Sequence, residues 1–136
     1  MLDVSSAALA RARTRLGPKA ALAHFIEADV IADWQTPTVD VWHDRALFHF
    51  LTVAEERDAY VRHLRRSLKS GGTAIIATFA PDGPTKCSGL PVERYSPARV
   101  AALLGPEFQV AEAVTDSHQT PFGGTQSFSY GRFIRS

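Results

Sequence analysis

Residues 73–80, TAIIATFA, form the most apolar stretch of the chain and decide its fold class. A continuous apolar run of this length, bounded by turn residues, is typical of a strand buried on both faces in a parallel sheet. KSGG, residues 69–72, precedes it as a predicted turn, and a loop with three Pro and two Gly residues follows at 81–95. The run therefore predicts a central parallel strand, from which the other elements can be placed.

The residues before this strand predict another strand and then a helix. VDVWHD, Val39–Asp44, has the pattern of a strand that ends in polar groups. Thr52 and Glu55 have the spacing of a capping box, in which each side chain accepts a hydrogen bond from the other residue's backbone N–H. A helix is therefore expected from this point to about Leu68, with a right-handed crossover between the two strands.

The residues after the central strand predict a helix and an antiparallel pair. Ser96 and Pro97 are typical of the first residues of a helix, and Gly105 with the following Pro ends it. Segments 107–116 and 127–136 are strand-like, and the short loop between them favours a hairpin. The long loop at 81–95 is a candidate substrate lid because of its length and its Pro and Gly content.

The first thirty residues repeat the alternation of strand and helix. Leu2 and Asp3 resemble the end of a strand, a Ser-capped helix is expected over Ala7–Leu16, and AHFIEAD, Ala23–Asp29, is a short buried strand. We therefore predict one α/β domain over residues 1–136. It has a Rossmann-like, mostly parallel sheet, helices on both faces and a C-terminal antiparallel hairpin.

Composition and charge narrow the functional class. The net charge of +1 gives no electrostatic reason to expect a nucleic-acid or anionic-membrane partner. No apolar run approaches the roughly 20 residues of a spanning helix. The single Cys87 cannot form an internal disulfide or a zinc cluster. A cytoplasmic enzyme or binding domain is the expected class.

Four segments, taken in order, resemble the class I S-adenosylmethionine-dependent methyltransferases, in particular those of methyltransferase types 11, 12 and 25. LDVSSAALARAR at 2–13 is similar to their second conserved segment, and ADV at 28–30 to the third. VDVWHDRALFHFL at 39–51 is similar to the fourth, and LRRSLKSGGTAIIATF at 64–79 to the helix, turn and fifth strand. The resemblance runs from Leu2 to Phe133. It implies methyl transfer from S-adenosylmethionine to an unidentified acceptor, expected to be a small molecule.

The resemblance also implies which residues bind the cofactor. Asp3 would hold the ribose, Asp29 would accept from the adenine amino group, and the backbone N–H of Val30 would meet a ring nitrogen. Val4 and His43 complete the expected cofactor contacts. The alternatives are that Asp3 only caps the following helix and that Asp29 is an ordinary turn residue.

The candidate catalytic residues are His43 and Asp44 at the end of the fourth strand and His49 on the turn behind it. His118, in the predicted last loop, is a candidate substrate contact. An imidazole can take a proton from a thiol, amine or hydroxyl near neutral pH. The alternatives are that His43 bonds to a neighbouring loop and that His118 is an ordinary surface residue. No metal-ligand spacing is present, so no metal is expected.

In the family, whose strand order is 3-2-1-4-5-7-6, a first strand and a glycine-rich loop precede the segment that LDVSSAALARAR resembles. We therefore expect an N-terminally truncated domain that binds S-adenosylmethionine very weakly or not at all by itself. The edge of Val39–Asp44 would then be open and could support a homo-oligomer. The alternative is a non-catalytic binding or interaction domain that kept the fold and lost the cofactor loop.

Overall fold

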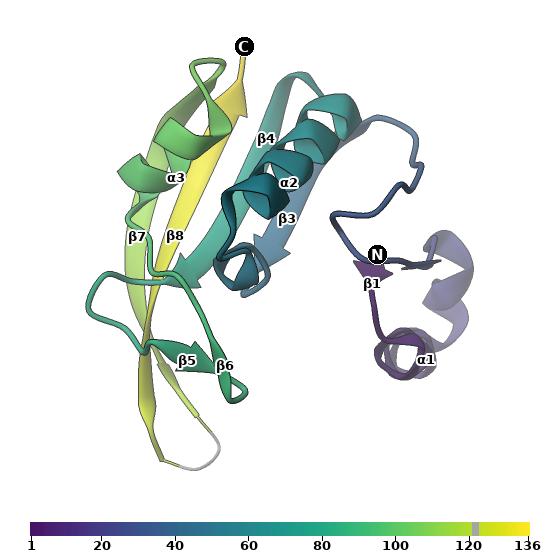
Figure 1. Cartoon of the computed structure of the whole chain (residues 1–136). Helices are drawn as coiled ribbons and strands as arrows, with labels where there is room; N and C mark the ends of the chain where they lie inside the picture. Colours follow the sequence, from purple (N-terminus) through teal and green to yellow (C-terminus); the bar gives the residue numbers. More distant parts are fainter. Residues whose placement is uncertain (121–122) are drawn as a thin grey trace. The chain divides into compact units, whose positions relative to one another are not determined.

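The computed structural model describes residues 1–120 and 123–136, which form two compact units, Met1–Thr36 and Pro37–Ser136 (Figure 1). The first unit contains β1 (Leu2–Asp3), α1 (Ser6–Leu16), the 3-10 helix η1 (Gly17–Leu22) and β2 (Ile26–Glu27). β1 and β2 pair in parallel, with Leu2 opposite Ile26. The expected end of a strand, the helix and the next strand are therefore all present.

Local capping explains the bounds of α1. The Ser5 hydroxyl accepts from the backbone N–H of Ala8 at 3.2 Å, and Gly17 ends the helix with a φ of 52°. The strand predicted over Ala23–Asp29 is shorter than expected, because β2 pairs with only the short β1 among the described strands. Backbone bonds from Ile26 to the Met1 carbonyl and from Ala28 to the Asp3 carbonyl hold this pair.

The second unit is a sheet with helices packed on it. Its elements are β3 (Val39–Arg45), the 3-10 turn η2 (Phe48–Phe50), α2 (Ala54–Ser67), β4 (Leu68–Phe79), the small hairpin β5 (Lys86–Cys87) and β6 (Leu90–Pro91), α3 (Pro97–Leu104), β7 (Phe108–Gln119) and β8 (Thr125–Arg135). The strand order is β3-β4-β8-β7. Figure 1 shows α2 and α3 on the same face of this sheet.

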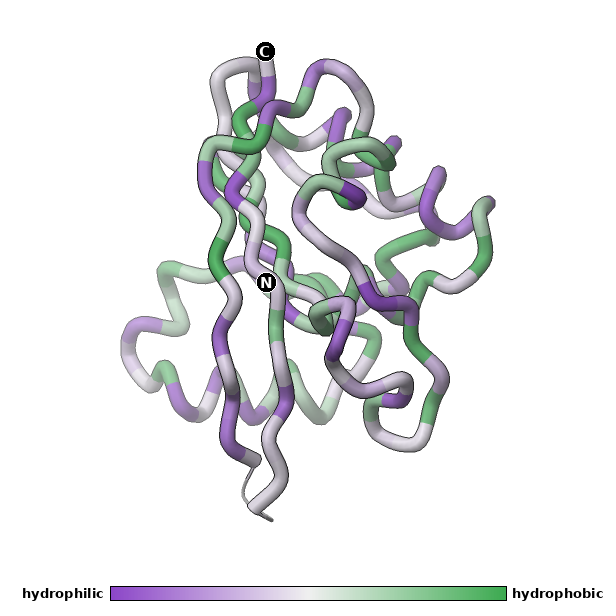
Figure 2. The backbone as a smooth tube through the Cα atoms, turned by 90° about the vertical axis from the view of Figure 1, so that its left-hand side faces the viewer, coloured by the Kyte–Doolittle hydropathy of each residue, from purple (hydrophilic) through white to green (hydrophobic). Residues whose placement is uncertain are grey.

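This arrangement confirms the α/β fold and the inner position of residues 73–80. β4 pairs in parallel with β3 and antiparallel with β8, so the sheet is mixed. The predicted terminal hairpin is also confirmed, since β7 and β8 pair antiparallel. Ala74 and Ile76 of β4 and Phe133 of β8 are almost fully buried in the core. Figure 2 shows the hydrophobic segments along the body of the sheet and hydrophilic ones toward the far end of the β7–β8 hairpin.

Three local predictions were wrong. KSGG is not a turn, because β4 continues through it; the register shifts there, so that Leu68 lies opposite Val39 and Thr73 opposite Val41. Thr52 does not cap α2. Its backbone N–H bonds to the Phe50 carbonyl in the turn before the helix.

The helix instead begins at Ala54, after Val53, whose N–H donates to the Glu56 carboxylate at 3.4 Å. His118 lies within β7 rather than in the loop, because the hairpin is longer than predicted. The loop residues Pro121 and Phe122 lie outside the described residues.

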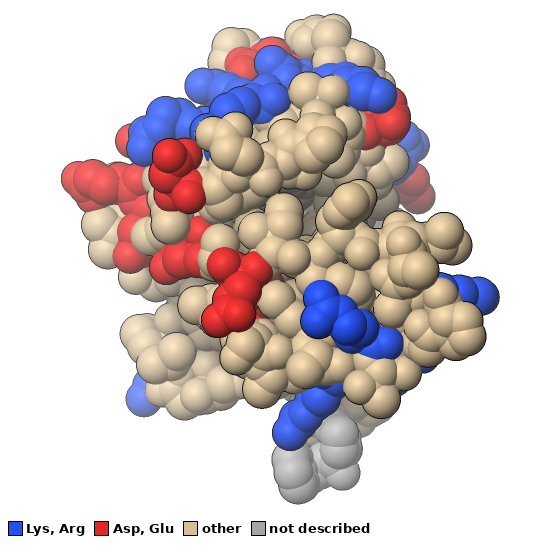
Figure 3. Space-filling view, turned by 90° about the vertical axis from the view of Figure 1, so that its right-hand side faces the viewer, with Lys and Arg blue, Asp and Glu red and all other residues tan. Residues whose placement is uncertain are grey.

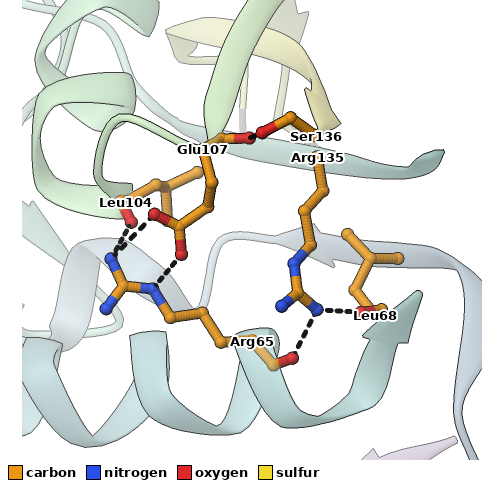
Figure 4. Close-up of polar contacts among 6 residues, drawn as sticks. All are labelled: Arg65, Leu68, Leu104, Glu107, Arg135 and Ser136. Atoms are coloured by element: carbon orange, nitrogen blue, oxygen red, sulfur yellow. Dashed lines mark hydrogen bonds and ion pairs between the residues drawn. The ribbon is translucent and has the colours of Figure 1, made fainter. Parts of the chain in front are cut away.

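Two arginines connect the C-terminal end of α2 to the last elements of the chain (Figure 4). Arg135 donates to the carbonyl of Arg65, near the end of α2, and to that of Leu68, the first residue of β4. The Arg65 side chain pairs with Glu107 and donates to the Leu104 carbonyl at 2.8 Å. A cation at this end of a helix satisfies carbonyls that have no helical partner and interacts favourably with the helix dipole.

We expect Arg135→Ala to lower the free energy of unfolding of the second unit by about 2 kcal/mol, because two partly buried carbonyls lose a charged donor. Arg132→Ala on the same strand is the matched control, since within the described part of the chain Arg132 makes only an exposed ion pair with Glu112 at 3.1 Å. Its loss should cost less than about 1 kcal/mol. Urea unfolding of both variants measures the difference, and equal losses would contradict a capping role for Arg135.

Candidate functional site

Asp3 and Asp29 lie at the same end of the parallel β1–β2 pair. Asp3 is the last residue of β1, and Asp29 follows β2 by two residues. Each carboxylate uses Oδ1 locally: Asp3 accepts from Ser5 N–H at 2.8 Å and Asp29 from Ile31 N–H at 3.1 Å. Among residues 1–120 and 123–136, neither Oδ2 has a hydrogen-bond partner. Both acids therefore support the local backbone and keep one oxygen for a further donor.

Val30 follows Asp29 directly and is buried, whereas Val4 is largely exposed. The carbonyl of Val30 accepts from Trp34 Nε1 at 3.0 Å, which fixes the turn after β2. Its backbone N–H has no acceptor in the part of the chain that the structure describes. The three groups that the sequence assigned to adenosine binding in this unit, Asp3, Asp29 and the Val30 N–H, are thus each able to make one more hydrogen bond.

Asp44 forms a buried network at the end of β3. Its carboxylate accepts from the backbone N–H groups of Leu47 and Phe48 at 3.1 and 3.2 Å and from the Tyr60 hydroxyl at 2.7 Å. Tyr60 in turn accepts from Trp42 Nε1 at 2.8 Å. Burial raises the pKa of the Asp44 carboxyl above its usual value, and the three hydrogen bonds act in the opposite direction. The network joins β3, the η2 turn and α2.

His49, in the η2 turn, is fully buried against the end of β4. Its Nδ1 accepts from the Phe79 backbone N–H at 3.3 Å, and its ring lies 4.7 Å from the rings of both Phe50 and Phe79. Burial lowers its pKa to about 4, so the ring is neutral at physiological pH. No partner for Nε2 lies among the described residues.

The structure does not bring the candidate catalytic residues together. His43 is exposed, whereas Asp44 and His49 are buried in contacts within the protein. His43 and Asp44 are consecutive in a strand, so their side chains point to opposite faces of the sheet. His118 is exposed on β7, with its ring 6.4 Å from that of Phe128.

The loop at 81–95, predicted as a substrate lid, is ordered by backbone hydrogen bonds, one of which joins it to the sheet. Gly83 bonds to Ala80, Val92 bonds back to Thr85, and Tyr95 bonds to Phe79 at the end of β4. Cys87, on β5, packs against a buried cluster of Ala77, Phe79, Val92 and Phe128. The loop therefore has a packed structure of its own, and Cys87 belongs to that packing.

Charged side chains gather in patches on the surface. On the face drawn in Figure 3, basic and acidic side chains gather in several groups, some of which touch, and the rest of the face is uncharged. The described residues contain no group of three or more His, Cys, Asp or Glu side chains that could hold a metal ion. Within those same residues, no helix is long and apolar enough to cross a membrane.

Comparison with known families supplies the identification. The family described as "Methyltransferase domain" matches residues 1–76, more than half of the chain. This chain belongs to the methyltransferase domain family. No curated protein matches it.

Solved structures share the fold of this methyltransferase domain. The N-methyltransferase NodS from Bradyrhizobium japonicum WM9 is 14% identical, with a TM-score of 0.74 over 98% of this chain. Its complex with S-adenosyl-L-homocysteine is 15% identical, with a TM-score of 0.69 over 98%. A 1,6-didemethyltoxoflavin-N1-methyltransferase from Burkholderia thailandensis, with bound 1,6-didemethyltoxoflavin and S-adenosylhomocysteine, is 16% identical, with a TM-score of 0.69 over 99%.

The present chain spans 71%, 64% and 60% of the length of these three chains. At these identities the similarity establishes the fold of the methyltransferase domain, and the function must be argued from its own residues.

Sequence reasoning missed the role of Tyr60 in this methyltransferase domain. Tyr60 is a buried residue of α2, and its hydroxyl connects Asp44 and Trp42. The available signal was the chemistry of the side chain, because a Tyr on the buried face of a helix usually has a partner for its hydroxyl. An acid at the end of the preceding strand was the candidate partner.

Proposed function

We propose that this chain is a methyl-transfer domain, or the C-terminal part of one, that uses S-adenosylmethionine and a small-molecule acceptor. The observation that carries the proposal is the pair Asp3 and Asp29 at one end of the β1–β2 pair, each with an oxygen that no described residue occupies. Family membership supports an enzyme over the non-catalytic alternative.

The residues of the first unit fit the adenosine part of this cofactor. A carboxylate can accept from both neighbouring hydroxyls of a ribose, which suits Asp3. Asp29 can accept from the adenine amino group while the adjacent Val30 N–H donates to a ring nitrogen. When bound, S-adenosylmethionine supplies a methyl group activated on a sulfonium, so the protein needs to position the acceptor and exclude water.

The candidate catalytic residues then have different roles. His43 is exposed and can take the proton that an acceptor loses. Asp44 and His49 are positioning residues in this proposal, because both are buried. Asp44 accepts from the turn that follows β3, and His49, in that turn, accepts from Phe79 at the end of β4. His118, exposed on the β7–β8 hairpin, remains a candidate contact for the acceptor.

Self-association through β3 is part of the same proposal. Among the described strands, β3 pairs only with β4, so its other edge presents free backbone groups. Val41, in the middle of this strand, is 55% exposed. An unpaired edge with an exposed β-branched residue is suited to pairing with a second copy of the chain.

In a form of the chain that also carries the first strand and glycine-rich loop of the family, we expect Asp3→Ala to weaken S-adenosylhomocysteine binding by about 10- to 100-fold, since a charged hydrogen-bond acceptor for the ribose is lost. Titration calorimetry measures this directly. Asp3→Asn keeps an oxygen for the Ser5 N–H and removes the charge, so it separates ribose binding from helix capping. Asp82→Ala, an exposed acid in the other unit, is the charge control. Unchanged affinity in Asp3→Ala would assign Asp3 to capping alone.

A further inference from the structure

The alternation of β3 places Arg45 on the sheet face opposite α2. Trp42 and Asp44 both bond to Tyr60 of α2, so they mark the covered face. His43 and Arg45 therefore point to the other face, at the carboxyl end of the strand. In open α/β sheets, ligands bind outside the carboxyl ends of the strands.

Strand register brings aromatic residues to the same face. Arg45 lies opposite Ala77, and Ala77 lies opposite Tyr130 on the next strand. Residues directly opposite share a face, so the Tyr130 ring is on the same side as the Arg45 side chain. The Tyr130 ring is partly exposed and lies 6.2 Å from the ring of Phe128.

Phe128 fixes the guanidinium of Arg45. The Arg45 Cζ lies 5.1 Å from the centre of the Phe128 ring, which is only 4% exposed. This cation–π contact holds the head group over the ring without using any of its N–H donors. A guanidinium held in this way presents its donors to a carboxylate in the geometry of a bidentate pair.

Arg45 has no carboxylate partner in residues 1–120 and 123–136, although it is exposed and charged. Arg132, on the same face, is already paired with Glu112 at 3.1 Å. A single unpaired guanidinium beside partly exposed aromatic surface matches a ligand with one negative charge and a planar ring. A phosphate dianion fits this site less well, because a phosphate is usually bound by several cations.

We propose that Arg45 binds the carboxylate of an aromatic acid, with Tyr130 against the ring of that acid and His43, two residues before Arg45, on the same face. This names the class of methyl acceptor and so rests on the proposed function. The binding site itself consists of residues from the second unit only. It can therefore be tested without the cofactor.

The experiment is an NMR titration of the full chain with 4-hydroxybenzoate, with 4-hydroxybenzamide as the uncharged analogue. We expect the acid to shift the signals of Arg45 and Tyr130 and the amide to leave them unchanged. Arg45→Gln should weaken binding of the acid by about tenfold or more, because the charged bidentate pair is lost. Arg45→Lys should give an intermediate loss, since it keeps the charge without the planar fork.

Arg62→Gln is the matched control, because Arg62 is exposed on α2 and its loss changes the net charge equally. Equal weakening by Arg62→Gln and Arg45→Gln would overturn the proposal, and so would equal binding of acid and amide. Stronger Arg45-dependent shifts with inorganic phosphate than with the acid would also overturn it.

Titration of the same variants with S-adenosylhomocysteine separates this proposal from the proposed function. Arg45-dependent binding of the acid, with no binding of S-adenosylhomocysteine even in a form of the chain that carries the family's first strand and glycine-rich loop, would support the aromatic-acid site and contradict methyl transfer. Binding of S-adenosylhomocysteine without Arg45-dependent binding of the acid would support methyl transfer and overturn the aromatic-acid site.

Discussion

Asp44→Ala should lower the free energy of unfolding of the second unit by about 3–5 kcal/mol, because it removes the charged acceptor of a buried network. The backbone N–H groups of Leu47 and Phe48 and the hydroxyl of Tyr60 would all lose their acceptor. Phe48 and Tyr60 are fully buried and Asp44 is only 6% exposed, so at least two of these donors would be left without water or another acceptor. Urea unfolding, followed by NMR signals from β4, measures the loss.

Two further variants keep this prediction testable if Asp44→Ala does not fold. Tyr60→Phe removes one of the three donors and should cost about 1–2 kcal/mol. Asp40→Ala, on the same strand, removes an acid that is exposed and paired with Lys69 at 2.8 Å, so it should cost less than about 1 kcal/mol. A Tyr60→Phe variant as stable as Asp40→Ala would contradict the role given to the network.

His49 should make the second unit less stable as the pH falls from 7 to 4. Burial lowers its pKa from 6.5 to about 4, so the unfolded chain takes up a proton in this range and the folded chain does not. The stabilisation is therefore complete above pH 6.5 and is lost as the pH falls toward 4. Its size is about 3 kcal/mol, because a tenfold change in proton affinity corresponds to about 1.4 kcal/mol.

The comparison with His49→Asn isolates this effect. Asn keeps an acceptor near the position of Nδ1 for the Phe79 N–H and does not titrate. The raised pKa of Asp44 acts in the opposite sense, because it favours the folded state at low pH. The difference between the two pH profiles removes that contribution. Profiles that run parallel from pH 7 to pH 4 would show that His49 does not contribute.

The sequence predicted correctly those helices and strands that are determined by neighbouring residues. The apolar run at 73–80 is an inner strand, and Ser96 caps α3 by accepting from the Arg99 N–H at 3.2 Å. Capping at Thr52 was wrong by one residue, because the backbone of Thr52 is bonded into the η2 turn. The strand at Ala23–Asp29 was overestimated, since the length of a strand depends on its partner as well as on its own residues.

The candidate site was harder to predict because its contacts are distant in sequence. An acid at the end of a strand gives the same sequence pattern whether its side chain faces a ligand or the hydroxyl of a residue sixteen positions away. The different roles of Asp44 and Asp3 could therefore not be distinguished from the sequence. Arg45 was not noticed, since its contact with Phe128 depends on the register of three strands. The composition of the chain carries no information about that register.

The side chains of β3 point alternately to the two faces of the sheet, and this limits which mutations the strand can accept. His43, Asp44 and Arg45 occupy successive positions, and the middle one faces α2 while the outer two face away from it. A substitution at one of these positions alters one function and leaves the neighbours in place. A single-codon insertion or deletion upstream in the strand would exchange the two faces, turning Asp44 outward and a cation into the core. Related sequences should therefore vary in the residues of this strand far more readily than in its length.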